Sequence, residues 1–319
     1  YQLILSPKDI LSEKLHVYNS NQPSLLMHRE LVDSNTALKF NQSLIKVSAA
    51  VKDELTAKCL KNMSLFAARK AVNCNLGEID DVRDWMINHT LPVIDLGQKM
   101  FNYAERNMLE NPDAKKHLLD FCHNIGFNIE DMAVEKDYMS LTPEMIQFIK
   151  SSGQLSDENA SKLSKDPKMP NGFKTDFIVS VINKRGKEIY TLPKASQSEG
   201  TLRAMGIETA LYVAEQNNKL LPIDEIETSM HPLLLKFMIQ SFLKVQSRSQ
   251  LLLTTHYDPL FTAVDDYLRK DSFWLMDKRD DGHSELYPLI SKNGVNKMRS
   301  LQRAYLNNKL GALPQIANV

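Results

Sequence analysis

The chain has 319 residues, 43% of them hydrophobic and 24% charged, which is typical of a folded globular protein and excludes a disordered one. Lysine plus arginine and aspartate plus glutamate both number 39, so no net positive charge indicates a nucleic-acid partner, although a local basic patch stays open. The three cysteines lack the spacing of a metal or redox motif, and no apolar run is long enough to span a bilayer. We therefore expect a cytoplasmic protein with no membrane partner.

Residues 1–41 are predicted to form a small antiparallel β unit. Alternating apolar and polar residues mark the runs YQLIL, EKLHVYN and SLLMHRE, which polar turns separate. Tyr1 stands inside the first of these runs, and a native chain rarely starts within a strand. We therefore expect that a further segment precedes Tyr1.

Residues 42–172 are predicted to be a mostly helical insertion. Apolar residues recur at helical spacing from Gln42 to Val72, and again in LPVIDLGQKMFNYAERNML and DAKKHLLDFCHNIG. A further helix in LTPEMIQFIKSSG has Thr142 as its N-cap and Pro143 at its first position. The polar stretch QLSDENASKLSKDPKMPNG then predicts an exposed connection.

Residues 173–319 are predicted to form an α/β lobe. Two strands around a turn at Lys184–Gly186 open it, and a hairpin around Asp281 and Gly282 ends the series. Between them, SQSEGTLRAMGIETALYVAEQNN and HPLLLKFMIQSFLKVQ read as helices, and KLLPIDE and QLLLTTHYDPLF as buried strands. Near-continuous apolar strands that alternate with helices predict a sheet covered on both faces.

Three polar segments lie where open α/β sheets place ligands. Asp224 and Glu225 end the apolar run LLPI, where one acid can hold Mg²⁺ and the next can activate water for phosphoryl transfer. His256 follows the next apolar strand, where an imidazole could contact a γ-phosphate or position the attacking water. Ser198 and Gly200 precede a helix N-terminus, which favours anions. Taken singly, each segment is a serviceable turn or helix cap, and only their order and spacing together favour a nucleotide site.

These segments carry a resemblance to a known family. LPIDEIETSMHP resembles the Walker B segment of ABC-type ATPases of the Rad50/SMC kind, QSEGT a divergent form of their signature motif, and TTHYDPLF their switch-histidine segment. The chain is more similar still to the bacterial ATP-binding AAA proteins of the abortive-infection, OLD-like group, and YLNNKLGALPQI resembles the end of that group. The resemblance implies an α/β ABC-ATPase head with an antiparallel β subdomain at 1–41, a helical insertion at 42–172 and a C-terminal ATPase lobe at 173–319.

The resemblance also implies roles for individual residues. Asp224 is the Mg²⁺-associated acid, Glu225 the general base and His256 the switch histidine. Ser198 and Gly200 belong to the signature loop, which contacts the γ-phosphate of ATP held by the opposite protomer. The cofactors expected are therefore ATP and Mg²⁺.

Other positions of the family pattern are less defined or differ. The segment Thr228–His231 stands where such ATPases place the loop that communicates across the dimer. Glu227 and His231 are assigned no defined step of the reaction, and an interface role and a structural role are given equal weight for them. No GxxxxGK[ST] phosphate loop occurs in the sequence. The nearest segment, NGFKTD at 171–176, lacks the spacing of that motif. The resemblance places that loop before the β unit, which again leads us to expect a preceding segment.

The function implied is that of an ATPase subunit of a bacterial antiphage, abortive-infection system. We expect a head-to-tail homodimer or larger homo-oligomer that controls an effector protein, a nuclease or other toxin, encoded with it. One alternative is a Rad50/SMC-like DNA-maintenance ATPase, which should carry a long heptad coiled coil. The other is a scaffold of the same fold that does not hydrolyse ATP.

Overall fold

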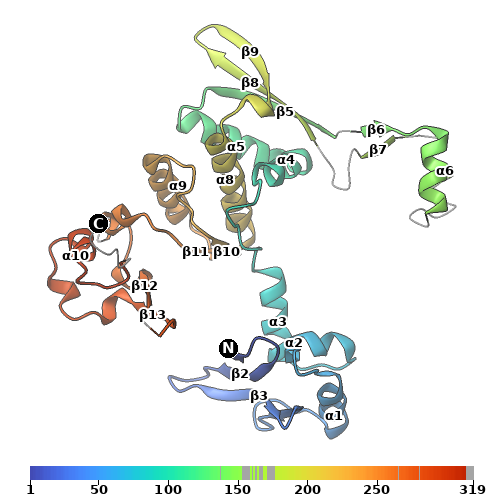
Figure 1. The fold of residues 1–319 in the computed structure, drawn as a ribbon, viewed down its shortest axis with the longest axis vertical. Helices are drawn as coiled ribbons and strands as arrows, with labels where there is room; N and C mark the ends of the chain where they lie inside the picture. Colours follow the sequence, from blue (N-terminus) through green and yellow to red (C-terminus); the bar gives the residue numbers. More distant parts are fainter. Residues whose placement is uncertain are drawn as a thin grey trace. The chain divides into compact units, whose positions relative to one another are not determined.

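The computed structural model describes residues 1–136, 138–152, 159, 161, 164, 168–170, 177–264, 266–279 and 281–313 (Figure 1). The chain divides into two compact units, Tyr1–Thr90 and Leu91–Val319. The division falls inside the predicted helical insertion, and the three-region division at 1–41, 42–172 and 173–319 stays a prediction. Most of the predicted polar connection, and NGFKTD with it, lies outside the described residues. Within the described part, no helix is long and apolar enough to cross a membrane.

The first unit combines an antiparallel sheet with short helices, drawn in blue shades in Figure 1. The sheet has the order β1-β2-β3-β4, so each strand pairs with its neighbour in the chain. Its strands are β1 (Gln2–Leu5), β2 (Ile10–Val17), β3 (Ser24–Val32) and β4 (Asn35–Phe40). Its helices are α1 (Ala49–Lys58), α2 (Leu65–Ala68), η1 (Arg69–Ala71) and α3 (Glu78–Asn88). The antiparallel β unit predicted for the start of the chain is confirmed.

The core of the first unit joins the sheet to the helices that follow it. Fully or nearly fully buried residues come from β2 and β3 and from α1, α2 and α3, among them Leu15, Leu26, Met27, Leu55, Leu65 and Ile79. Because a helix or a sheet must bury its apolar face against another element, the helices up to residue 90 belong to the core of the β unit.

A fully buried arginine lies inside this first unit. Arg29 donates from Nη2 to the carbonyls of Leu60 (3.1 Å) and Lys61 (2.9 Å) and from Nη1 to the carbonyl of Ile10. One side chain therefore joins β3 to the start of β2 and to the turn after α1.

The second unit contains a small parallel sheet. β10 (Leu220–Ile223) pairs in parallel with β11 (Gln250–Leu253). Residues 91–94 lie along the other edge of β10, where Ile94 donates to the carbonyl of Pro222 (3.0 Å) and Asp224 donates to the carbonyl of Ile94 (2.8 Å). The carboxyl ends of three parallel segments therefore share one edge.

Two expectations for these segments are wrong. Residues 91–94 were predicted as part of a helix, because Leu91 and Ile94 have helical spacing; hydrogen bonds to β10 hold them extended instead. The sheet was predicted to be covered on both faces, yet Leu252 of β11 is 58% exposed. Alternate residues of a strand point to opposite faces, and the described residues cover only the face of Leu251 and Leu253.

Helices pack around this sheet and form the largest core of the chain. They are α4 (Phe101–Glu110), α5 (Pro112–Asn124), α8 (Glu199–Asn217) and α9 (Pro232–Lys244). α8 contacts both α4 and α5, and ten of its residues are buried. Such burial on all sides explains why α8 shows no clear amphipathic pattern in its sequence.

The second unit also contains an antiparallel sheet, which adds Ile129, Met132 and Val181 to the same core. This sheet has the order β5-β8-β9 and contains β5 (Ile129–Lys136), β8 (Phe177–Arg185) and β9 (Glu188–Pro193). The other short elements are, in chain order, β6 (Tyr138–Ser140), α6 (Pro143–Ser151), β7 (Lys168–Pro170), η2 (Lys194–Ser196), η3 (Asp258–Ala263), η4 (Lys270–Ser272), β12 (Trp274–Lys278), β13 (Ser284–Pro288), η5 (Leu289–Ser291), η6 (Val295–Lys297) and α10 (Leu301–Leu306).

Several local predictions for this part are confirmed and one is wrong. Both hairpins form, β8–β9 and β12–β13, and Thr142 caps α6 by accepting from the N–H of Met145. The predicted helical middle contains the strand β5, which the sequence pattern missed. β5 pairs with β8, more than forty residues later in the chain, and such long-range pairing overrides local propensity.

Ionisable side chains meet between α5 and α8. His117 Nε2 lies 2.8 Å from Glu208 Oε1, and its ring stacks on Tyr212. Burial raises the pKa of Glu215 to about 7; the nearby charge of Glu208 adds to the rise, and His117 opposes it. The interface between α5 and α8 is therefore sensitive to pH near neutrality.

We expect Glu215→Gln to be more stable than the wild type at pH 8 and equally stable at pH 5. A carboxyl whose pKa rises on folding contributes stability that is complete below its ordinary pKa of 4.5 and is lost as the pH rises through 7. Thermal unfolding at both pH values tests this, with the exposed Glu188→Gln as the control that keeps the wild-type pH dependence. An identical loss of Tm in wild type and Glu215→Gln would contradict the prediction.

Candidate functional site

The two predicted acids lie at the shared edge of the parallel sheet, where a threonine of the next strand end holds them. Asp224 and Glu225 follow β10, and Thr254 follows β11. The Thr254 hydroxyl donates to Asp224 Oδ1 and accepts from the backbone N–H of Glu225 at 2.9 Å. One hydroxyl thus ties the side chain of the first acid to the backbone of the second.

Glu225 and His256 lie next to each other at this edge. Glu225 Oε1 is 3.5 Å from His256 Nε2, and the Thr228 hydroxyl is 3.5 Å from Glu225 Oε2. Glu225 has a positive φ of 43°, which is uncommon for a residue other than glycine and shows that its surroundings hold the backbone in place. The His256 side chain is 86% exposed, so both groups are open to a ligand.

Glu227 holds the loop that carries His256. Its Oε1 accepts from the backbone N–H of His256 at 2.7 Å, and its Oε2 is buried without a hydrogen-bond partner among the described atoms. The sequence assigned Glu227 no defined role in the reaction. In the structure, its carboxylate holds the loop after β11 through the backbone of His256. His231 caps α9 by accepting from the N–H of Leu233, which supports the structural one of its two predicted roles.

The signature-like segment packs on the loop that follows the acids. Ser198 is the N-cap of α8 and accepts from the N–H of Thr201 at 3.1 Å. A Cβ at Gly200 would lie 2.4 Å from the carbonyl oxygen of Ser229, so only glycine allows this close approach. The described contacts bring Gly200 to this loop, but they join neither Ser198 nor Gly200 to Asp224.

The donor atoms at the sheet edge suit a magnesium ion. Mg²⁺ takes oxygen ligands, keeps several waters and is commonly bound through one or two carboxylates plus phosphate oxygens. The Asp224 carboxylate and the Thr254 hydroxyl supply such oxygens side by side. Within the described residues, at this edge or elsewhere, no group of three or more His, Cys, Asp or Glu side chains forms a metal-binding cluster. Such an ion would therefore need nucleotide or water ligands.

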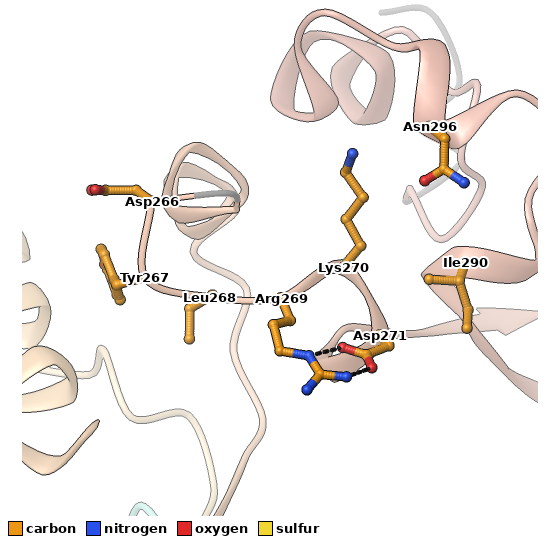
Figure 2. Close-up of a pocket in the computed structure, with 8 residues that line it drawn as sticks. All are labelled: Asp266, Tyr267, Leu268, Arg269, Lys270, Asp271, Ile290 and Asn296. Atoms are coloured by element: carbon orange, nitrogen blue, oxygen red, sulfur yellow. Dashed lines mark hydrogen bonds and ion pairs between the residues drawn. The ribbon is translucent and has the colours of Figure 1, made fainter. Parts of the chain in front are cut away.

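A separate hollow of about 580 Å³ lies between residues 266–271, Ile290 and Asn296. Figure 2 shows Arg269 turned toward Asp271, with Arg269 Nε donating to Asp271 Oδ1 at 2.9 Å. Arg269 and Asp271 therefore form an ion pair with each other. The hollow shares no lining residue with the sheet edge that holds Asp224 and Glu225, so we do not assign it to the site.

Sequence reasoning did not single out Thr254 or Arg203. It named Glu227 but did not predict its role. The signal for Thr254 was its place, since it is the first polar residue after an apolar strand. No local pattern pointed to Glu227 or Arg203, because their contacts come from segments distant in the sequence.

If the chain has the ATPase activity that the resemblance implies, Thr254→Val should lower Mg²⁺-dependent ATP turnover by about ten- to a hundredfold, since a misplaced catalytic group typically costs that much. Valine keeps the shape of threonine and removes the hydroxyl that links Asp224 to Glu225. Thr255→Val is the matched control, because the Thr255 hydroxyl only accepts from the N–H of Tyr257. Steady-state turnover across Mg²⁺ concentrations checks this; equal effects of the two substitutions would contradict it.

Comparison with known families extends over most of the chain. The profile of the family described as "AAA domain, putative AbiEii toxin, Type IV TA system" matches residues 1–262. The matched region includes Ser198, Gly200, Asp224, Glu225 and His256. No curated protein matches the chain.

Proposed function

Because the chain belongs to this AAA domain family, we propose that it is an ATP-binding and ATP-hydrolysing subunit of ABC type in a bacterial abortive-infection defence system. The single observation that carries this proposal is the sheet edge itself. Asp224 and Glu225 end one parallel strand, Thr254 binds both of them from the next, and His256 lies 3.5 Å from Glu225. Adjacent acids at a strand end, with an exposed imidazole beside them, suit phosphoryl transfer to water.

Each residue has a separate task in the proposed reaction. Asp224 would hold Mg²⁺ through its carboxylate and the water shell of the ion, which would supply positive charge beside the phosphates. Glu225 accepts the proton of the attacking water, as a general base within hydrogen-bond reach can do. His256 donates a hydrogen bond to the γ-phosphate from its exposed ring, while Glu227 holds its backbone.

The proposal includes an assembly of at least two copies. Ser198 and Gly200 contact the γ-phosphate of ATP that the opposite protomer holds, in a head-to-tail homodimer or larger homo-oligomer. Support comes from α8, whose first turn presents backbone N–H groups to an anion and which packs through Gly200 on the loop after the acids. ATP then links the protomers, and hydrolysis loosens them in the cytoplasm.

The family description also supports a partner. A toxin-associated AAA domain suits an ATPase that restrains or recruits an effector protein, a nuclease or another toxin, encoded with it. The predicted helical middle, residues 42–153, is our proposed lever or docking region for that partner.

Phosphate release and molecular mass test the proposed function directly. The full-length protein should release phosphate from ATP only with Mg²⁺ present, and its mass in light scattering should rise by at least one protomer with ATP and fall with ADP. Binding of ATP without turnover would favour the scaffold alternative. Turnover that depends on DNA ends would favour the DNA-maintenance alternative.

A further inference from the structure

One face of α8 lies against two of the segments that leave the sheet edge. Gly200, Arg203 and Gly206 are spaced by three residues and therefore share one face of the helix. Gly200 meets the carbonyl of Ser229 in the loop after β10, and a Cβ at Gly206 would lie 2.4 Å from the carbonyl carbon of Met100. Arg203 stands between these two close contacts.

The guanidinium of Arg203 is buried and incompletely bonded. The residue is 9% exposed, and its Nε and Nη2 atoms are buried without a hydrogen-bond partner among the described atoms. Burial lowers the pKa of Arg203, and the negative charges of Asp95 and Glu225 oppose that shift. A buried charge without a partner is strongly unfavourable, so a second state in which those donors are satisfied would lower the free energy.

The two acids whose charges act on Arg203 come from neighbouring segments of the sheet. Asp95 follows Ile94, and Glu225 comes two residues after Ile223, the partner of Ile94 in the parallel bridge. Asp95 is exposed and accepts from the N–H of Gly97 at 3.0 Å, which leaves lone pairs on its carboxylate for further donors. Arg203 can therefore connect α8 to both strand ends.

We propose that Arg203 is a positioning residue whose guanidinium pairs with Asp95 and Glu225 and so couples α8 to the acid that activates water. The inference rests on the proposed ATPase function and adds to it a route between the two composite sites of the dimer, because α8 serves the partner's ATP and Glu225 serves the ATP of its own protomer. α8 carries Ser198 and Gly200 at its start, so contact of these residues with a partner's nucleotide also moves or holds Arg203. Glu225 is then held for catalysis only when α8 is engaged.

Steady-state kinetics of the full-length protein test this with Arg203→Met, which keeps the length and apolar stem of the side chain and removes its donors. We expect kcat to fall by about ten- to a hundredfold, with KM for ATP changed by less than about twofold, because Arg203 does not touch the nucleotide. Arg203→Lys should recover part of kcat, since it keeps the charge but not the fork of donors. Arg248→Met, at an exposed arginine just before β11, is the matched control and should behave as wild type.

A second variant separates coupling from folding. Asp95→Asn leaves α8 unaltered and keeps the oxygen that accepts from Gly97; it should lower kcat less than Arg203→Met, and the double variant should be no worse than Arg203→Met alone. If Arg203→Met fails to fold in thermal unfolding, Arg203→Lys and Asp95→Asn carry the test. If the wild type hydrolyses ATP and these variants have the same kcat, the inference is wrong and the proposed function stands. If the wild type does not hydrolyse ATP, both the proposed function and the inference are wrong.

Discussion

Replacing Glu225 by glutamine is expected to lower ATP turnover at least about a hundredfold while leaving ATP binding intact, because loss of a general base typically costs that much or more. Glutamine keeps the shape of the side chain and can still lie beside His256, whose Nε2 is 3.5 Å from Glu225 Oε1 in the wild type. It cannot take a proton from water. The nucleotide should then persist in the site, and the ATP-linked assembly should accumulate.

Two measurements check the Glu225 prediction. Phosphate release should fall with little change in nucleotide affinity, and light scattering with ATP should show a larger species that outlasts the wild-type assembly. Glu188→Gln, the same change on the exposed β9, should alter neither. Wild-type turnover in Glu225→Gln would assign the proton to another group, and loss of binding would make Glu225 a ligand rather than a base.

Replacing Arg29 by alanine is expected to destabilise the first unit by about 3 kcal/mol or more, because each buried hydrogen bond from a charged group contributes about 1.5–3 kcal/mol. Arg29 is fully buried, and its guanidinium satisfies the carbonyls of Ile10, Leu60 and Lys61. Glu13 is also fully buried; burial raises its pKa, and the charge of Arg29 opposes the rise. Alanine would take the guanidinium donors away from three carbonyls, of which Leu60 and Lys61 keep only the backbone N–H groups of Met63 and Ile10, and would take that charge away from Glu13.

Hydrogen exchange of the full-length protein measures this loss within residues 1–90. Amides of β2 and β3 should exchange about a hundredfold faster or more in Arg29→Ala. Lys58→Ala removes a charge from the same unit, but both side chains of its ion pair with Glu54 are exposed, so it should cost about 1 kcal/mol at most. Equal protection in Arg29→Ala and wild type would show that the buried network adds nothing to stability.

The elements that could be predicted are those whose signal is local. Alternation marked β2 and β3, the turn residues near Gly186 and Gly282 marked two hairpins, and Thr142 with Pro143 marked the start of α6. The polar residues at the ends of two apolar strands also located Asp224, Glu225 and His256 correctly at one edge, because parallel strands end on the same side.

What could not be predicted depends on partners far along the chain. Residues 91–94 have helical spacing but are extended because β10 supplies their hydrogen bonds, and β5 exists because β8 pairs with it. The boundary at Thr90 arises from how the early helices pack on the β unit.

The sequence by itself determined the acids, the histidine and the glycine-containing helix start, since these depend on residue type and on position relative to a strand or helix. Only the tertiary structure decided how they are held: Thr254 binds Asp224 and Glu225, and Glu227 binds the backbone of His256. The physical reason is that a hydrogen bond or a buried charge acts over a few ångströms in space, and the chain separates most of these pairs by more than twenty residues.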